Sequence, residues 1–208
     1  MNSEFQNILE KVSALYMKYG IKSITMDDVA RELGISKKTL YQFVENKNEL
    51  VEKVVDYVIN LKECGFKKID EIKMNAVEKL IEVNMHIIES MKDYNPATEY
   101  DLKKYYPEIY AKMHSVRRQR MHDSILANIK KGKEEGLYRT ELKEEIIARM
   151  QVSRFMNMHE DEFLTKNDLQ RSEFIHELFI YHIRGIANEK GLEVLEKTLQ
   201  KINFNNYI

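Results

Sequence analysis

The stretch TMDDVARELGISKKTLYQFVENK, from Thr25 to Lys47, holds two short helix-like segments separated by one glycine. Thr25 followed three residues later by Asp28 is typical of a capped helix start. Gly34 predicts the end of this helix, because glycine adopts the left-handed conformation without penalty. Ser36 is a good N-cap for a second helix. The stretch therefore predicts two helices joined by a tight turn.

The polar and apolar positions of this stretch indicate what the two helices do. We expect the second helix to run through about Val44, and the inward positions are Val29, Leu33, Ile35, Leu40 and Phe43, with the small Ala30 at the contact. A helix-turn-helix projects its second helix into the major groove of DNA. Cations, hydroxyls and amides bind phosphates and base edges. The candidate DNA-binding residues are Thr25, Ser36, Lys37, Lys38, Thr39, Tyr41, Gln42 and Lys47.

The composition places limits on the rest of the molecule. Two prolines and seven glycines in 208 residues favour an almost wholly helical chain. The net charge of −1 means that a nucleic-acid surface must be local. One cysteine excludes an internal disulfide and fits a reducing cytoplasm. The charged N-terminal segment predicts no signal peptide, and no apolar run is long enough to span a membrane.

Helical periodicity recurs along the whole chain, so we expect an all-α protein. The segments run from about 3 to 19, from 48 onward, and over 72–91, 107–135, 142–156, 168–188 and 191–201. The expected breaks are YNPATEYD, KKYYPE, EEGLYRTE, HEDEFLTKND and NEKG. We expect a DNA-binding domain over residues 1–47 and a helical regulatory and dimerisation domain over 48–208.

The longer stretch TMDDVARELGISKKTLYQFVENKNEL resembles the DNA-binding signature of the tetracycline-repressor-like (TetR) transcriptional regulators. Thr39-Leu40-Tyr41 and Lys47 stand where that family has its recognition-helix Thr-Leu-Tyr and a phosphate-binding lysine. The departure is at Phe43-Val44, where many members carry His or Tyr and then Phe, and it bears on DNA sequence preference.

The resemblance implies a three-helix DNA-binding head joined to a larger helical bundle that binds a ligand and dimerises. It implies a sequence-specific DNA-binding regulator, by family default a repressor, that a small molecule releases from a palindromic operator. The expected partners are double-stranded operator DNA, a second copy of the chain and an unknown small-molecule effector. No cofactor, no metal and no membrane partner are expected.

Two further groups of residues are candidates for these roles. The segment RSEFIHELFIYHIRGIANEKG has a broad apolar surface, and its internal glycine predicts the close approach of a partner helix. The candidate dimer-interface residues are Ile146, Met150, Phe174, Leu178, Tyr181 and Gly185; the alternative is a helix buried within one chain. The middle of the chain is rich in Tyr and Met, which suit a ligand cavity or simply fill a core. The candidate pocket residues are His86, Tyr106, Tyr110, Met113, Arg117 and Met121.

Two other classes of function remain as alternatives. A metal-dependent helical-bundle enzyme would need two Glu-x-x-His pairs, and only Glu173 and His176 form one. The acidic patch from His159 to Glu162 could hold a metal, but it lies in a predicted loop and is typical of a solvated surface. No phosphate loop or nucleophile motif is present, so an enzyme is not expected. A helix-turn-helix adaptor that contacts proteins in place of DNA is the second alternative.

Overall fold

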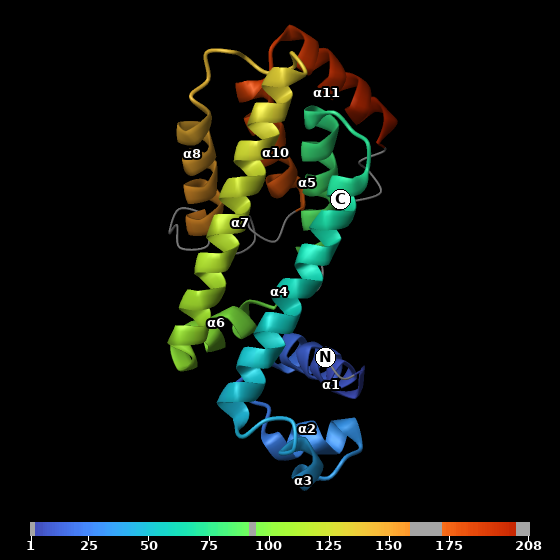
Figure 1. Cartoon of the computed structure of the whole chain (residues 1–208), viewed down its shortest axis with the longest axis vertical. Coiled ribbons are helices and arrows are strands. Elements are labelled where there is room, and N and C mark those ends of the chain that lie inside the picture. Colours follow the sequence, from blue (N-terminus) through green and yellow to red (C-terminus); the bar gives the residue numbers. More distant parts are fainter. Residues whose placement is uncertain (1–2, 92–94, 159–171, 203–208) are drawn as a thin grey trace. The chain divides into compact units, whose positions relative to one another are not determined.

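The computed structural model of the chain describes residues 3–91, 95–158 and 172–202, which form helices joined by turns (Figure 1). The all-α prediction is confirmed, and the β contact in these ranges is an isolated bridge between Tyr138 and Ala187. The chain divides into two compact units, residues 1–65 with 93–116 (the first unit) and residues 66–92 with 117–208 (the second unit). The boundaries after residues 65 and 116 fall inside long helices, α4 (Lys47–Glu71) and α7 (Pro107–Glu134), so each unit contains part of both helices.

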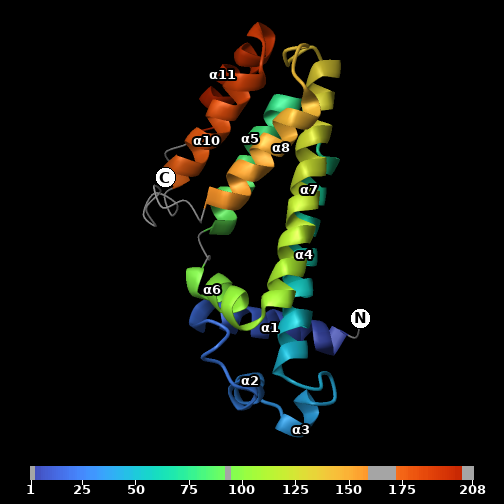
Figure 2. The same cartoon turned by 90° about the vertical axis from the view of Figure 1, so that its left-hand side faces the viewer.

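The first unit contains α1 (Ser3–Tyr19), α2 (Met26–Leu33), α3 (Lys37–Leu40) and α6 (Pro96–Tyr105), with the starts of α4 and α7. Helix α1 packs against both α2 and α6, and α6 lies beside α1 in Figure 2. One apolar core joins these elements, and its most deeply buried members include Leu9, Val12, Ile21, Val29, Leu40, Leu50 and Val51. Each such side chain contributes roughly 1.5–3 kcal/mol by its removal from water.

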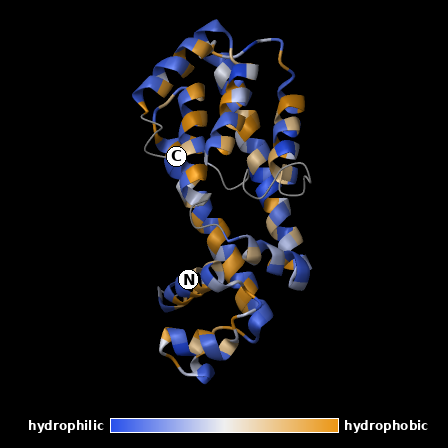
Figure 3. Ribbon diagram, turned by 180° about the vertical axis from the view of Figure 1, so that it is seen from behind, coloured by the Kyte–Doolittle hydropathy of each residue, from blue (hydrophilic) through white to orange (hydrophobic). Residues whose placement is uncertain are grey.

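The second unit contains α5 (Ala76–Met91), α8 (Glu144–Asn157), α10 (Ser172–Ile186) and α11 (Glu189–Lys201), with the ends of α4 and α7. Helix α5 packs against both α10 and α11. Helices α5, α10 and α11 are amphipathic, and Figure 3 shows apolar and polar residues interspersed along the helices. Two apolar clusters result, one including Val77, Ile81, Ile183 and Leu195 and the other formed by Ile88, Met158, Ile175 and Phe179.

A buried tyrosine closes the turn that follows α7. The Tyr138 ring is fully buried, and its hydroxyl donates to Asn128 Oδ1 at 3.0 Å, while Asn128 Nδ2 donates to the Ala76 carbonyl at 2.9 Å. Burial raises the pKa of Tyr138, which keeps its hydroxyl a donor. A methyl group on Gly132 would collide with the Tyr138 ring, so only glycine fits there.

The expected helix boundaries hold in some places and fail in others. The segments at 3–19 and 107–135 match α1 and α7 closely. The prediction that the second helix of the opening stretch reaches about Val44 is wrong, because α3 ends at Leu40. The amides of Gln42 and Phe43 bond back three residues, and this tighter turn stacks Phe43 on Phe5 with ring centroids 5.4 Å apart.

The largest error in the predicted helices concerns α6, because nearly all of its residues lie in segments that the sequence predicts to be breaks between helices. Asn95 caps this helix, since its side-chain oxygen accepts from the Ala97 amide at 2.9 Å, and Pro96 fills the first helical position. Helix α4 also continues to Glu71, so the next helix begins only at Ala76. Part of NEKG is helical, because Asn188 caps α11. The expected break HEDEFLTKND lies outside the described residues.

Lowering the pH from 6.5 to 4 should destabilise the second unit through His182, which is 9% exposed. Burial lowers the pKa of His182 from 6.5 to about 4, and the nearby Arg154 charge adds to this effect. Because the unfolded imidazole takes up a proton below pH 6.5 and the folded one does not, the free energy of unfolding falls with pH by about 3 kcal/mol in all. Urea unfolding at a series of pH values measures this slope.

The matching variant is His182→Gln, which removes the titrating group from the core. Its unfolding free energy should change less between pH 6.5 and 4 than that of the unaltered protein. Equal slopes for the two proteins would contradict the assignment to His182.

Candidate nucleic-acid interface

Local hydrogen bonds fix the start of α2 and the turn that follows it. Thr25 Oγ1 accepts from the Asp28 amide at 3.1 Å, and the Thr25 amide donates to Asp28 Oδ2 at 2.9 Å, so the predicted capping box is present. Gly34 has a φ of 68°, and the Ile35 amide then reaches the Ala30 carbonyl at 3.0 Å. A side chain at residue 34 would strain this conformation, so the glycine determines the turn.

Helix α3 is a single turn with one buried and one polar side. Ser36 Oγ accepts from the Thr39 amide at 3.0 Å and caps it. Leu40 is fully buried and anchors the turn to the core. Most of the predicted DNA-binding residues here are exposed (Ser36, Lys37, Lys38, Tyr41 and Gln42), and Thr39 is half-buried. The described geometry therefore presents a polar surface along α3 and the residues that flank it.

The two lysines at the start of α3 differ in their surroundings. Lys37 lies 2.9 Å from Asp27 Oδ1, and this hydrogen-bonded pair raises the pKa of Lys37. Both side chains are more than half exposed, so the pair contributes little and a phosphate can displace the carboxylate. Lys38 forms no ion pair with a described residue. Both lysines are thus available to an anionic partner.

Lys47 has a structural contact that the sequence did not indicate. Its ammonium group donates to the Ile21 carbonyl at 2.7 Å, and burial lowers the pKa of Lys47. An ammonium group has three donors, so this bond leaves others for a DNA phosphate. The residue connects the start of α4 to the loop between α1 and α2.

Three side chains from α6 and its cap hold the same loop and the end of α1; we call Asn95, Thr98 and Asp101 the α6 clamp. Thr98 Oγ1 donates to the Tyr16 carbonyl at 2.8 Å, and Asn95 Nδ2 donates to the Met17 carbonyl at 2.8 Å. The buried Asp101 accepts from the Lys22 amide at 2.7 Å. The bond to Met17 satisfies a carbonyl that a helix end leaves without a helical partner, whereas the Tyr16 carbonyl also accepts from the Gly20 amide at 2.9 Å. Sequence reasoning missed the clamp, although Asn-Pro was a helix-start signal.

The predicted pocket residues belong to two different units. Tyr106, Tyr110 and Met113 pack on the core of the first unit. In the second unit, His86 lies edge-on to Phe66 with ring centroids 5.1 Å apart, and Arg117 is exposed. Met121 is half-buried in that unit. A cleft between α7 and α8 is lined by none of these six side chains.

The predicted dimer residues lie on α8 and α10. Arg154 of α8 donates to the Leu178 carbonyl of α10 at 3.1 Å and stacks on the Tyr181 ring, so the two helices lie side by side. The exposed fraction is 51% for Ile146, 63% for Met150 and 73% for Tyr181. A methyl group on Gly185 would meet nothing within 4 Å, and Phe174 and Leu178 are half-buried.

The residues considered for a metal site do not form one within the described part of the chain. No group of three His, Cys, Asp or Glu side chains gathers there, and His176 Nδ1 lies 2.9 Å from Asn84 Nδ2. The patch from His159 to Glu162 lies outside the described residues. None of the described helices combines the length and the apolar character that crossing a bilayer requires.

Two substitutions separate recognition of DNA from support of the fold. Tyr41→Ala removes a side chain that is 42% exposed, so the unfolding free energy should change by less than about 0.5 kcal/mol. Lys47→Ala breaks the bond to Ile21 and should cost about 1 kcal/mol. Both should weaken DNA binding, as should Lys37→Ala, whereas the control Lys197→Ala in α11 should not. Urea unfolding and gel shifts measure the two effects.

The losses of affinity for specific and for random duplexes distinguish a phosphate contact from a base contact. Because a lysine contact to phosphate is independent of sequence, Lys47→Ala should weaken binding to specific and random duplexes equally. Tyr41→Ala should weaken the specific complex more. Equal losses for both duplexes from every variant would contradict base recognition by α3.

The comparisons with known proteins agree with this geometry. Residues 8–54 match the family of bacterial regulatory proteins named tetR. The chain is 23% identical over 186 residues to YvaF of Bacillus subtilis (strain 168), an uncharacterized HTH-type transcriptional regulator, and the match covers 89% of this chain and 96% of that protein.

Solved structures share the fold along most of the chain. A transcriptional regulator from Cytophaga hutchinsonii superposes with a TM-score of 0.71 at 16% identity, over 90% of this chain and 100% of its own. AibR in complex with isovaleryl coenzyme A and operator DNA superposes with a TM-score of 0.55 at 18% identity, over 84% of this chain and 97% of its own. The helix-turn-helix of α2 and α3 thus lies inside the residues that match the tetR family of bacterial regulatory proteins, and the chain as a whole is similar to an HTH-type transcriptional regulator.

Proposed function

We propose that the protein is a homodimeric cytoplasmic repressor that binds two-fold-symmetric operator DNA and leaves it when a small molecule binds. The observation that carries the proposal is the polar N-terminal end of α3, which is exposed while Leu40 of the same turn is buried. The residues that we assign to DNA contacts are Thr25, Ser36, Lys37, Lys38, Thr39, Tyr41, Gln42 and Lys47. The base edges would meet α3, and Lys47 a phosphate.

A second copy of the chain completes the recognition unit. A helix of one turn reaches too few base pairs for a specific site, so two copies are needed, and their half-sites lie about 34 Å apart on the duplex. The exposed apolar side chains of α8 and α10 support a symmetric interface, because Ile146, Met150 and Tyr181 would otherwise remain in water. The open space over Gly185 lets a partner helix approach closely.

A ligand can act on DNA affinity because two helices continue from one unit into the other. Helix α4 begins next to the helix-turn-helix at Lys47 and ends in the second unit at Glu71. A ligand that binds one arrangement of these helices better than another shifts the population between them. Tenfold weaker operator binding requires a preference of only about 1.4 kcal/mol. AibR, which has this fold, was solved in complex with isovaleryl coenzyme A and operator DNA, so a protein of this fold binds both kinds of partner.

A gel shift with DNA from upstream of the protein's own gene tests the proposal. We expect a specific shift that weakens as salt rises, because phosphate contacts release counterions. Light scattering should show a dimer at micromolar concentration. A monomer that does not dimerise on the duplex, or a protein that shifts no duplex at any salt concentration, would contradict the proposal and favour the adaptor alternative.

A further inference from the structure

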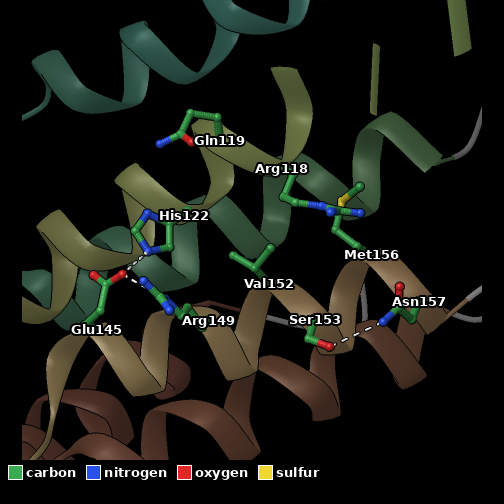
Figure 4. A pocket seen from close by; sticks show the side chains of 9 residues that line it. All are labelled: Arg118, Gln119, His122, Glu145, Arg149, Val152, Ser153, Met156 and Asn157. Atoms are coloured by element: carbon green, nitrogen blue, oxygen red, sulfur yellow. Dashed lines mark hydrogen bonds and ion pairs between the residues drawn. The ribbon is translucent and has the colours of Figure 1, made fainter. Parts of the chain in front are cut away.

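The second unit contains a cleft of about 420 Å³ between α7 and α8 (Figure 4). Residues 118–122 of α7 form one wall, and residues 145–157 of α8 form the other. A volume of this size lies within the range of roughly 300–1,000 Å³ that small-molecule sites occupy. The chemistry of its lining differs between the two ends.

One end of the cleft satisfies its own charges. Glu145 Oε1 accepts from Arg149 Nε at 2.9 Å and lies 3.2 Å from His122 Nε2. The hydrogen bond from Arg149 and the His122 contact lower the pKa of Glu145, so this carboxylate stays ionised and neutralises the arginine. This end offers no net charge to a ligand when His122 is neutral.

The other end carries a positive charge without a counter-charge. Arg118 lines the cleft and forms no ion pair with any residue that the structure describes. Asn157 Nδ2 donates to Ser153 Oγ at 3.3 Å, which leaves the Asn157 carbonyl and the Ser153 hydroxyl proton for other partners. In Figure 4 Arg118 extends toward Met156, whereas Gln119 points away from the other labelled side chains. A planar guanidinium in this position suits a carboxylate or a phosphate.

Apolar side chains lie between the two ends. Val152 is 6% exposed and Met156 is 8% exposed, yet both line the cleft. Methionine adapts to irregular apolar shapes, so this part accepts a short hydrocarbon chain and selects weakly among chain shapes. The lining therefore fits a molecule with one anionic end and one apolar body.

We propose that this cleft binds a small organic anion, a carboxylate or phosphate monoester on a short apolar chain. Arg118 binds the anionic group, and Val152 and Met156 contact the chain. The role of this anion as the effector rests on the proposed function. Arg118 stands two residues after Val116, where α7 passes from the first unit into the second. A ligand bound to Arg118 therefore acts on the turn of α7 that connects the units.

Isothermal titration calorimetry on the protein without DNA tests the site. The carboxylates are butanoate, hexanoate and octanoate, hexyl phosphate is the phosphate monoester, and hexanamide is the neutral control. We expect the anions to bind at least about tenfold more tightly than hexanamide, because hydrogen bonds to charged groups are the stronger ones. Comparison of hexanoate with hexyl phosphate identifies the preferred anionic group.

The neighbouring arginine provides a matched control. Arg118→Gln should weaken anion binding about tenfold. Arg117→Gln should leave it unchanged, because Arg117 is also exposed but does not line the cleft. Circular dichroism confirms that both variants keep their helix content. No anion binding at millimolar concentration, equal binding of hexanamide, or equal effects of the two arginine variants would overturn the proposal.

The gel shift is measured separately, so the two proposals fail in different ways. Anion binding without any DNA shift would contradict the proposed function and leave the site intact. A specific DNA shift without anion binding would contradict the anion site and leave the proposed function intact. If the bound anion leaves the operator complex unchanged, the cleft binds an anion but is not the effector site.

Discussion

Met150→Asp should convert the dimer to a monomer and abolish tight operator binding. Met150 is 63% exposed in the protomer, so the aspartate is well hydrated there and the unfolding free energy of the monomer changes little. In the proposed dimer the same position is buried, and symmetry places two unpaired carboxylates in an apolar interface. The expected cost is about 3 kcal/mol or more, which raises the dimer dissociation constant over about 100-fold.

Sedimentation velocity measures the change in oligomeric state, and a gel shift measures its effect on DNA. Leu61→Asp is the control, because Leu61 is a similarly exposed apolar side chain of α4 at 59%. That variant should remain a dimer and keep its affinity for DNA. A dimeric Met150→Asp protein would place the interface elsewhere than α8 and α10.

Gly132→Ala should lower the free energy of unfolding by about 3 kcal/mol, although alanine is the better helix former. The added methyl group would overlap the Tyr138 ring, which is fully buried and hydrogen-bonded to Asn128. The added methyl group therefore forces the ring or the turn after α7 to shift. Urea unfolding measures the loss, and a smaller loss in a Tyr138→Leu background would confirm that the ring is its cause.

Gly185→Ala is the matched substitution, and we expect it to raise the free energy of unfolding where Gly132→Ala lowers it. This glycine is also helical, but a methyl group there meets nothing within 4 Å of its own chain. In the monomeric Met150→Asp background the change should stabilise the protein by up to about 1 kcal/mol. Destabilisation by both glycine variants would show that helix packing around α10 is tighter than the described contacts.

Local sequence signals predicted the helix-turn-helix well, because each of its determinants acts within a few residues. The capping box of Thr25 and the left-handed Gly34 depend only on neighbouring backbone groups. The same local reasoning failed for helix α6. The Tyr, Asp and Pro residues of this segment suggested a break, whereas Asn95 and Pro96 begin a helix. Its partners lie about eighty residues away in the chain, where local patterns carry no information.

The cleft between α7 and α8, our proposed anion site, shows a different limit of sequence-based prediction. Arg117 was a candidate and Arg118 lines the cleft, although the two are adjacent. One residue rotates a helix by about 100°, so the choice requires knowledge of which face meets α8. Helix α7 carries charged residues on several faces, so its pattern does not mark that side. The Glu145 carboxylate and the His122 ring meet in the cleft but come from different helices, α8 and α7. The spacing of residues in the sequence does not show that these two side chains meet.

The α6 clamp has a consequence for the exchange of DNA specificity between regulators. A chimera that transplanted only residues 1–54 onto a foreign body would lose the bonds to Tyr16, Met17 and Lys22. It would also expose apolar core surface that Leu102 and Ile109 cover. The portable cassette is therefore discontinuous in the gene, and a working hybrid must carry residues 93–116 as a second insert. Recombination at a single crossover would rarely yield a folded regulator of this type.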